Sequence, residues 1–344
     1  MRQPEILTLG LDIGYGAVKA VTEATSLVFP SVCGHARDIK FQQDEIAARH
    51  PGDQLRDEMG TWFIGDLALT QLPPGELLRL RGRTADEVTM GNVFRVRLAK
   101  AAIGKLWPGR AGGDILHLRV ATGLPVDHMP DAPELKAALL GQHVIKTDAT
   151  DFIANITEVM VMPQPYGTIY AQTLTESGEV NPAHSYMRTG VCDVGTFTVD
   201  LALDDDGEFV DAESGSVEGG VSGVLERIAA LLEREHRQKI SPKLIETVLR
   251  TGKFRAKGEM IDYSEAVESA LEPLRSATLN LMSEKWKAGT TVDVIYLSGG
   301  GAELVHEAVA AAYAQMQLVA QAQLANAQGY LHYALFAARV PEQS

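Results

Sequence analysis

Two short glycine-bearing turns repeat one another in the two halves of the sequence. The first reads LDIGYGAVK over residues 11–19, and the second reads CDVGTFTVD over residues 192–200. Each lies between two apolar runs rich in β-branched residues, which predicts a strand, a tight turn and a second strand. Two copies in matching register predict a duplicated α/β domain, with a nucleotide held between the halves.

The residue types in each turn suit the binding of phosphate. Glycine lets the backbone adopt a positive φ and approach a ligand without a Cβ in the way. Successive N–H groups on such a turn can converge on one phosphate oxygen. Asp12 and Asp193 each end the first strand of a hairpin and would suit a hydrated Mg²⁺ or an attacking water. Lys19 could reach the phosphates as a point charge. For one copy alone, an ordinary hairpin with a surface lysine is the alternative.

Two further positions have residues typical of a nucleotide site. The glycine run that follows Ser298 joins a predicted buried strand, 292–297, to a helix, where a flat ligand could lie against bare backbone near helix N–H groups. Close packing of a strand-to-helix turn is the alternative. Gln164 lies between two prolines directly before a helix, and a fixed amide there could orient an attacking water. It could equally be an ordinary turn residue.

Composition limits the class of protein. The 344 residues are 45% hydrophobic and 22% charged, which is typical of a soluble globular protein with two domains. No apolar run approaches the ~18 residues of a membrane span, and no signal peptide is expected at the N-terminus. Cys33 and Cys192 are expected to be buried free thiols in a reducing compartment. The nine histidines show no metal-ligand spacing. We therefore expect a cytoplasmic protein.

The apolar periodicity predicts the main elements. We expect irregular structure over 34–60. Strands are expected over 6–12, 17–24 and 26–33, and helices over 86–106, 166–175, 221–236, 263–287, 303–314 and 324–338.

The order of these segments resembles the actin, Hsp70 and sugar-kinase superfamily across almost the whole chain. In that superfamily the pieces are called phosphate 1, connect 1, phosphate 2 and adenosine. The sequence looks most like the prokaryotic actin-like ATPases of the ParM plasmid-segregation group. It has DIGYG at 12–16 with Lys19, VATGLP at 120–125, IYLSGGGA at 295–302 and ANAQGY at 325–330. The last phrase discriminates best, because sugar kinases and Hsp70 chaperones do not usually carry it.

The resemblance implies a two-domain actin-like ATPase fold in the α/β class. Each domain would be an RNase H-like mixed five-stranded sheet flanked by helices, with the nucleotide in the interdomain cleft. Residues 1–165 would form domain I, on which the C-terminal helix 324–344 packs back. Residues 166–323 would form domain II.

The resemblance also implies a role for each site residue. Asp12 would hold Mg²⁺ through water, and Asp193 with Gln164 would place the hydrolytic water. The remaining residues would bind the nucleotide. The β- and γ-phosphates would be bound by Gly14, Tyr15, Gly16 and Lys19. A second phosphate turn would be formed by Gly195 and Thr196, and the adenosine would lie against Gly299, Gly300, Gly301 and Ala302. Glutamine at 164 agrees with actins, whereas bacterial cell-shape actins and Hsp70 have glutamate. Tyr15 departs from the small hydroxyl residue of actin.

The function implied is hydrolysis of ATP, or of GTP, coupled to head-to-tail assembly into filaments. In the ParM group such filaments move DNA through a small DNA-binding adaptor. The net charge of −14 agrees with indirect coupling, because it offers no counterion-release drive for direct DNA binding. Binding to membranes is not expected. A sugar-kinase-like phosphotransferase is the first alternative and would need a catalytic base and a substrate pocket, which 34–85 could supply. A non-polymerising chaperone-type ATPase is the second and would need a further substrate domain.

Overall fold

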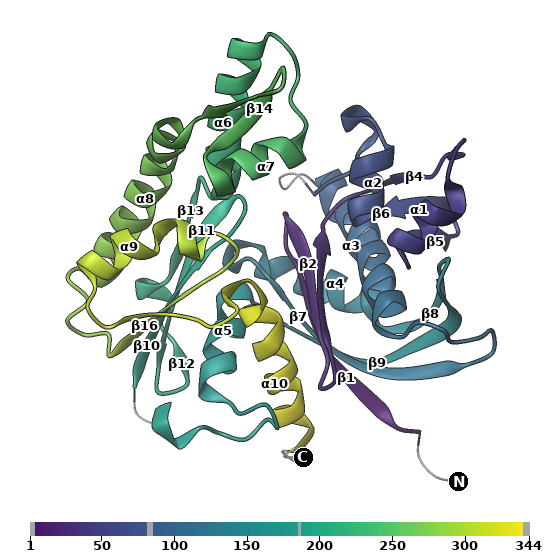
Figure 1. Ribbon diagram of the computed structural model, residues 1–344. Helices are drawn as coiled ribbons and strands as arrows, with labels where there is room; N and C mark the ends of the chain where they lie inside the picture. The colour runs from purple at the N-terminus through teal and green to yellow at the C-terminus, as the bar shows by residue number, and fades with distance from the viewer. Residues whose placement is uncertain (1–3, 81–84, 185–186, 340–344) are drawn as a thin grey trace. The chain divides into compact units, whose positions relative to one another are not determined.

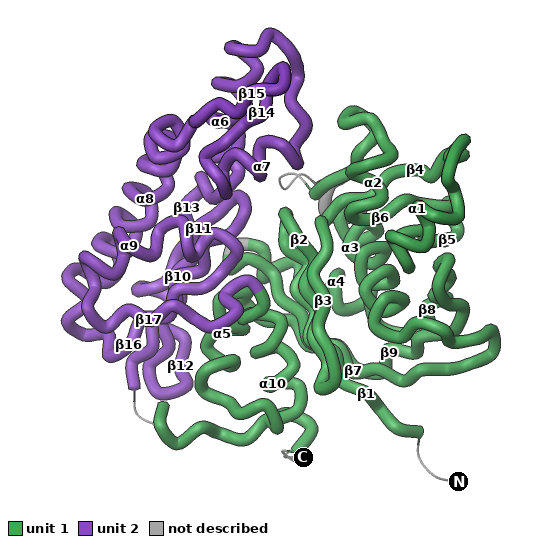
Figure 2. The backbone as a smooth tube through the Cα atoms, in the orientation of Figure 1, with its two compact units in different colours: residues 1–185, 324–344 green, residues 186–323 purple. Residues whose placement is uncertain are grey.

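The computed structural model describes residues 4–80, 85–184 and 187–339, which form two compact units (Figure 2). The first unit is Met1–Ser185 with Leu324–Ser344, and the second is Tyr186–Gln323. The first unit thus extends beyond the expected boundary at 165. The reason is that α5 (Gln164–Thr173) packs on α10 (Ala325–Arg339), which belongs to the same unit.

The first unit is built on a six-stranded mixed sheet with the order β3-β2-β1-β7-β9-β8 (Figure 1). Its strands are β1 (Ile6–Ile13), β2 (Ala17–Val21), β3 (Ser26–Pro30), β7 (Ile115–Leu124), β8 (Gly141–Lys146) and β9 (Asp151–Pro163). β1 pairs antiparallel with β2 and parallel with β7, and β7 pairs parallel with β9. The central strand β1 is buried from Thr8 to Ile13, which explains its nearly continuous apolar sequence.

The second unit repeats this pairing. Its main sheet contains β10 (Arg188–Val194), β11 (Thr198–Asp205), β12 (Glu208–Phe209), β13 (Gly215–Glu218), β16 (Val294–Ser298) and β17 (Met316–Leu318). β10 pairs antiparallel with β11 and parallel with β16, and β16 pairs parallel with β17. The duplicated mixed α/β architecture is therefore confirmed. The expected count of five strands is wrong for both sheets, because β8 adds an antiparallel edge strand beyond β9 in the first unit and β13 pairs with β11 as a sixth strand in the second.

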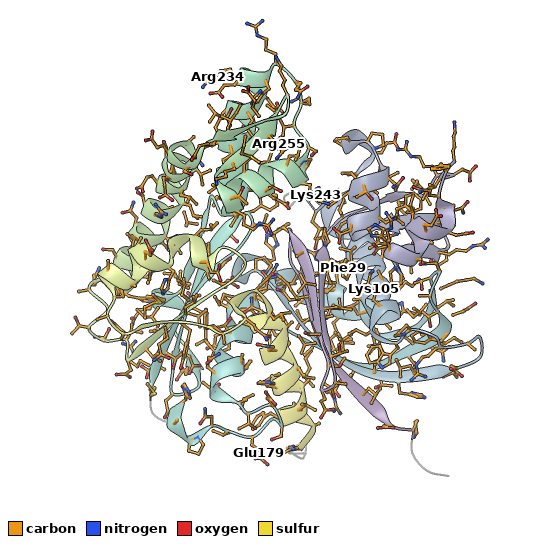
Figure 3. The ribbon with its side chains drawn as sticks, viewed as in Figure 1. Phe29, Lys105, Glu179, Arg234, Lys243 and Arg255 are labelled. Carbon is orange, nitrogen blue, oxygen red and sulfur yellow. The ribbon has the colours of Figure 1, made fainter. Side chains whose placement is uncertain are left out.

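A small three-stranded sheet replaces most of the irregular structure expected over 34–60. It contains β4 (Cys33–His35), β5 (Gln54–Asp57) and β6 (Gly60–Ile64), with the short helices α1 (Gln43–Arg49) and α2 (Gly65–Gln71). These elements are too brief for a readable period, and α1 has no buried residue. Lys105 of α3 (Ala85–Leu106) joins this region to the unit: its Nζ lies 2.6 Å from Asp53 Oδ1 and 5.6 Å from the ring centroid of Phe29 (Figure 3).

The helices follow the apolar periods closely. The second unit contains α6 (Val221–His236), α7 (Pro242–Thr251), α8 (Ser264–Trp286) and α9 (Ala302–Ala312). In α6 the residues Val224, Ile228 and Leu232 are buried on one face at a spacing of four, as the sequence pattern predicts. A hairpin of β14 (Lys253–Ala256) and β15 (Glu259–Asp262) was not expected. Since all four residues of β15 are exposed, no alternation marks it. The first unit also contains α4 (Ala132–Leu139).

Short 3₁₀ helices complete the path: Pro74–Glu76, Val126–Asp131, Pro182–His184, Asp211–Glu213 and Ala322–Leu324. Each unit has its own hydrophobic core, around Leu9, Leu98 and Leu118 in the first and around Val194, Ile228 and Leu297 in the second. No helix in the described part of the chain is long and apolar enough to cross a membrane.

The two cysteines are buried free thiols, as expected from the sequence. Burial raises the pKa of Cys33 to about 11 and also raises that of Cys192.

Candidate functional site

The first glycine turn is a closed and braced hairpin in the first unit. Gly14 N donates to Ala17 O at 3.1 Å. Ser31, which is fully buried beyond the end of β3, donates through Oγ to Gly14 O at 2.5 Å and through N to Gly16 O at 3.0 Å. A Cβ on Gly14 would lie 3.1 Å from Lys19 Nζ and 3.2 Å from Ala17 O, so the turn leaves little room for a side chain there. Sequence reasoning missed Ser31, because nothing local marks it as a brace.

Three predicted site residues of the first unit meet on one carboxylate. Asp12 is 2% exposed and lies opposite Lys19 in the register of the hairpin. Lys19 Nζ is 2.8 Å from Asp12 Oδ2, and Gln164 Nε2 donates to Asp12 Oδ1 at 3.1 Å. Gln164 is the first residue of α5 and follows directly on β9, two residues before the expected helix start. The fold therefore joins residues far apart in the sequence.

This geometry fixes the orientation of the Gln164 amide. An ionised carboxylate accepts hydrogen bonds and cannot donate them, so the amide nitrogen must face Asp12. The amide oxygen of Gln164 is then the atom left to accept a hydrogen bond from elsewhere. A charge-assisted pair such as Asp12 with Lys19 is stronger than a neutral hydrogen bond, which keeps the carboxylate in place.

Arg95 of α3 lies in the electrostatic environment of the first turn. Burial lowers the pKa of Arg95, while Tyr15 of the turn and Asp131 act to raise it. A half-buried guanidinium close to the turn adds positive charge where a phosphate would be bound. Arg95 could not be recognised from the sequence, since it is one of several charged residues along a helix.

The second glycine turn has the same closure in the second unit. Gly195 N donates to Thr198 O at 2.9 Å, as Gly14 N does to Ala17 O. Behind it, Val221 N donates to Gly195 O at 3.1 Å and Ser222 N to Thr196 O at 2.7 Å, so the start of α6 holds the turn. Gly220 has to be a glycine, because a Cβ there would overlap Gly195 O and lie 2.8 Å from Thr196 O.

Asp193 lies opposite a second carboxylate that the sequence did not reveal. In the register of β10 and β11 its partner is Asp200, and both residues are buried. Thr198 Oγ1 donates to Asp200 Oδ2 at 2.7 Å. The hairpin thus places two buried carboxyl groups opposite one another beside the turn. Burial, and then the charges of Asp193 and Asp200, raise the pKa of the nearby Cys192 thiol.

The glycine run after β16 divides into packed and open positions. Gly299 has φ +89, and a Cβ on it would overlap Asp193 Oδ1 and lie 2.5 Å from Val194 O. Gly301 N donates to Val194 O at 2.9 Å, and a Cβ on Gly301 would lie 2.6 Å from Val221 Cγ2. Close packing thus explains Gly299 and Gly301. Gly300 is exposed, with only Gln323 as near as 4.0 Å to a Cβ. Ala302 is buried as the first residue of α9.

The predicted site residues thus form two clusters. The first unit brings together Asp12, Lys19 and Gln164 beside the turn of Gly14, Tyr15 and Gly16. The second unit brings together Asp193, Gly195, Thr196 and the run from Gly299 to Ala302.

The residues present fit a water-coordinated Mg²⁺. Among the described residues, no group of three or more His, Cys, Asp or Glu side chains could hold a metal directly. Mg²⁺ dehydrates reluctantly and is commonly held by one or two carboxylates together with substrate phosphates. The single buried carboxylate of Asp12 beside a glycine turn is compatible with that mode of binding.

The two main sheets have the same strand pairing, and in each a glycine-bearing turn follows a buried aspartate. This arrangement defines a two-domain actin-like fold. Residues 10–167 match the family model described as actin like proteins N terminal domain. Residues 191–311 match the model described as archaeal actin homologue MreB-like, C-terminal. The chain belongs to the actin-like proteins. No protein of curated function matches it in sequence.

Solved structures share this fold over nearly the whole chain. A ParM from a 15-stranded filament of Clostridium botulinum is 22% identical, with a TM-score of 0.75, over 96% of this chain and 99% of that one. An archaeal actin homologue in complex with ADP is 17% identical, with a TM-score of 0.71 and the same coverages. The Alp12 filament protein is 14% identical, with a TM-score of 0.64, over 97% of this chain and 100% of that one. At these identities the comparison shows the fold.

Proposed function

We propose that this chain is a nucleotide-dependent filament-forming ATPase of the ParM group. It binds ATP, or GTP, assembles head to tail, and weakens the filament when the nucleotide is hydrolysed. The observation that carries the proposal is the contact of Asp12 with both Lys19 and Gln164. It is supported by two solved neighbours that are filament structures and one that contains ADP.

In the first unit, each residue has a defined task. The N–H groups of Gly14, Tyr15 and Gly16 bind phosphate oxygens, as successive amides of a turn do. Lys19 moves its ammonium from Asp12 to the β- and γ-phosphates. Asp12 then has Oδ2 available for the water shell of a magnesium ion. A bound Mg²⁺ would neutralise charge that develops on the phosphates.

The water that attacks the γ-phosphate is placed by Gln164 and Asp193. Because Gln164 Nε2 donates to Asp12, its Oε1 accepts a hydrogen bond from the water. Asp193 is the second acceptor, because its carboxylate can take a hydrogen bond from the same water. Gly195 and Thr196 form the second phosphate turn, and the run from Gly299 to Ala302 presents the exposed backbone of Gly300 to the adenosine.

The biological task we propose is segregation of a plasmid or other DNA in the cytoplasm. Head-to-tail contacts join two different surfaces and therefore propagate when the rotation does not close. A net charge of −14 disfavours direct contact with DNA. A small DNA-binding adaptor would link filament and cargo.

The test combines 90° light scattering, pelleting and phosphate release with Mg²⁺ and ATP, GTP or no nucleotide. We expect a nucleotide-dependent rise in scattering that decays as phosphate appears. Gln164→Ala and Asp193→Ala should prolong the rise, because filaments then keep their nucleotide. Gln172→Ala is the matched control, since it removes the same side chain near the other end of α5. Phosphate release without a concentration threshold and without a pellet would exclude the filament.

A phosphotransferase is the second candidate, favoured by a cavity of about 810 Å³ in the first unit. The turn between β5 and β6, with α3 and α4, lines it, and its carboxylates are those of Asp57, Glu58, Asp131 and Glu134. Although burial acts to raise the pKa of Asp57, hydrogen bonds from Arg97 and Trp62 lower it. Asp57 is thus a poor base, and Glu58, Asp131 or Glu134 would have to serve. ADP formation that requires an added sugar or polyol, without phosphate release, would favour this candidate.

A further inference from the structure

Helix α10 contacts every element that carries the Asp12 cluster. It packs on β1 with Asp12, β2 with Lys19 and α5 with Gln164, and also on β7, and the ANAQGY phrase forms the start of this helix (Figure 1). On β1, a Cβ at Gly10 would overlap Ala327 O and lie 2.7 Å from Leu331 N. On α5, a Cβ at Gly167 would lie 2.6 Å from both Cα and O of Asn326. The two helix backbones, and the backbone of β1, are therefore in direct contact.

Two side chains of α10 hold the first turn of α5. Tyr330 is fully buried, and its hydroxyl donates to the backbone carbonyl of Gln164 at 3.2 Å. Asn326 Oδ1 accepts from Thr168 Oγ1 at 2.8 Å and from Thr168 N at 3.1 Å. The hydroxyl of Tyr330 reaches Gln164 because residue 123, at the end of β7, is a glycine whose Cβ would overlap that hydroxyl.

From these contacts we infer that Tyr330 is a positioning residue for nucleotide hydrolysis, acting through Gln164. One helix contacts the strand of Asp12, two residues before that aspartate, and donates to the main chain of Gln164. It thereby sets the separation between the Asp12 carboxylate and the Gln164 amide. Because the Gln164 side chain makes a single hydrogen bond to Asp12, a small shift of the α5 turn changes where its amide oxygen points. The inference rests on the proposed function and assigns part of the ANAQGY phrase to it.

The experiment is Tyr330→Phe, which removes the hydroxyl and keeps the ring. We expect single-turnover hydrolysis of ATP to slow about tenfold, because misplacing a catalytic group by a fraction of an ångström has effects of this order. The dissociation constant for ATP should stay within about twofold, since the hydroxyl of Tyr330 donates to the main chain of Gln164, which is not one of the proposed phosphate-binding residues. Tyr333→Phe is the matched control. Tyr333 lies on the same helix and is half-buried. Its ring stacks on that of Tyr170, with 4.6 Å between the ring centroids.

Tyr330→Phe made in the Gln164→Ala variant distinguishes positioning of the Gln164 amide from a general effect on stability. Gln164→Ala keeps the backbone carbonyl that Tyr330 contacts but removes the amide that it positions. Adding Tyr330→Phe to Gln164→Ala should therefore change the hydrolysis rate no further. A rate for Tyr330→Phe equal to the wild-type rate, or an equal slowing in both backgrounds, would overturn the inference alone. A wild-type protein that releases no phosphate would overturn the proposed function as well.

Discussion

The contact between α5 and α10 predicts a large effect from one added methyl group, in Gly167→Ala. Inside a helix this substitution normally stabilises by about 1 kcal/mol, because alanine has the higher helix propensity. Here the new Cβ would lie 2.6 Å from two backbone atoms of Asn326 and 2.7 Å from Tyr330 Cε1. Ordinary contact begins at 3.4 Å, so the helices must separate by roughly 0.8 Å. Backbone atoms cannot rotate away as the end of a side chain can.

The gain in helix propensity and the cost of overpacking oppose one another, and the cost of overpacking is the larger of the two. Forcing a methylene into a packed interface costs about 1 to 3 kcal/mol. Separation of the helices also lengthens the hydrogen bonds Tyr330 Oη to Gln164 O and Thr168 Oγ1 to Asn326 Oδ1, each with a net value of about 1 kcal/mol. After the gain in propensity, we expect the free energy of unfolding to fall by about 2 kcal/mol. In a unit of this size that corresponds to a melting temperature lower by roughly 4 to 8 °C.

Thermal and urea unfolding, followed by circular dichroism, measure this difference. The control is Gly91→Ala in α3, where the nearest atom to a new Cβ is Arg95 Nη1 at 3.3 Å, the end of a flexible side chain. That variant should be neutral or slightly more stable than the wild type. Equal unfolding midpoints for the two alanine variants would refute the reasoning, because helix propensity alone would then account for both.

Two further predictions concern buried charges. Arg97 donates through Nε to Asp57 Oδ2 at 2.8 Å and covers the ring of Trp62 at 3.6 Å. Arg97→Met should lower the free energy of unfolding by about 1.5 to 3 kcal/mol, since it removes a charge-assisted hydrogen bond to Asp57, while Trp62 Nε1 and Met59 N still donate to Asp57 Oδ1. Urea denaturation checks this, and Arg97→Lys should recover part of the loss. Burial lowers the pKa of His332, so its contribution to stability is complete above about pH 6.5 and is lost as the pH falls below that value. His332→Gln should therefore flatten the decline of the melting temperature between about pH 6.5 and 5, and an unchanged decline would contradict the assignment.

The sequence was most informative where the relevant interactions are local. The two hairpins were predictable because each consists of adjacent strands with glycine in the turn, and α6 because its apolar period continues over four turns. Residues 34–60 and the hairpin 253–262 were not predictable in the same way. Their strands have three to five residues, and β15 has no buried face that would impose an alternation.

The site was predictable only in part, for a related reason. Asp12 and Gln164 could be named from their motifs, but their hydrogen bond depends on the order of strands β1, β7 and β9. Ser31 and Tyr330 act through partners that the fold, and not the sequence spacing, brings close. In the glycine run 299–301 the motif suggested contact with a ligand, but packing against Val194 is sufficient to explain the glycines at 299 and 301.

The route of the chain through the units has a consequence for its synthesis. Residues 324–339 return to the first unit after the entire second unit has been made. Until α10 leaves the ribosome, Gly10 on β1 and Gly167 on α5 expose bare backbone, and Gln164 lacks the hydrogen bond from Tyr330. A nascent chain can fold its second unit while the first lacks one of its packed layers. The Asp12 cluster is therefore assembled last, so an unfinished chain does not carry a complete site.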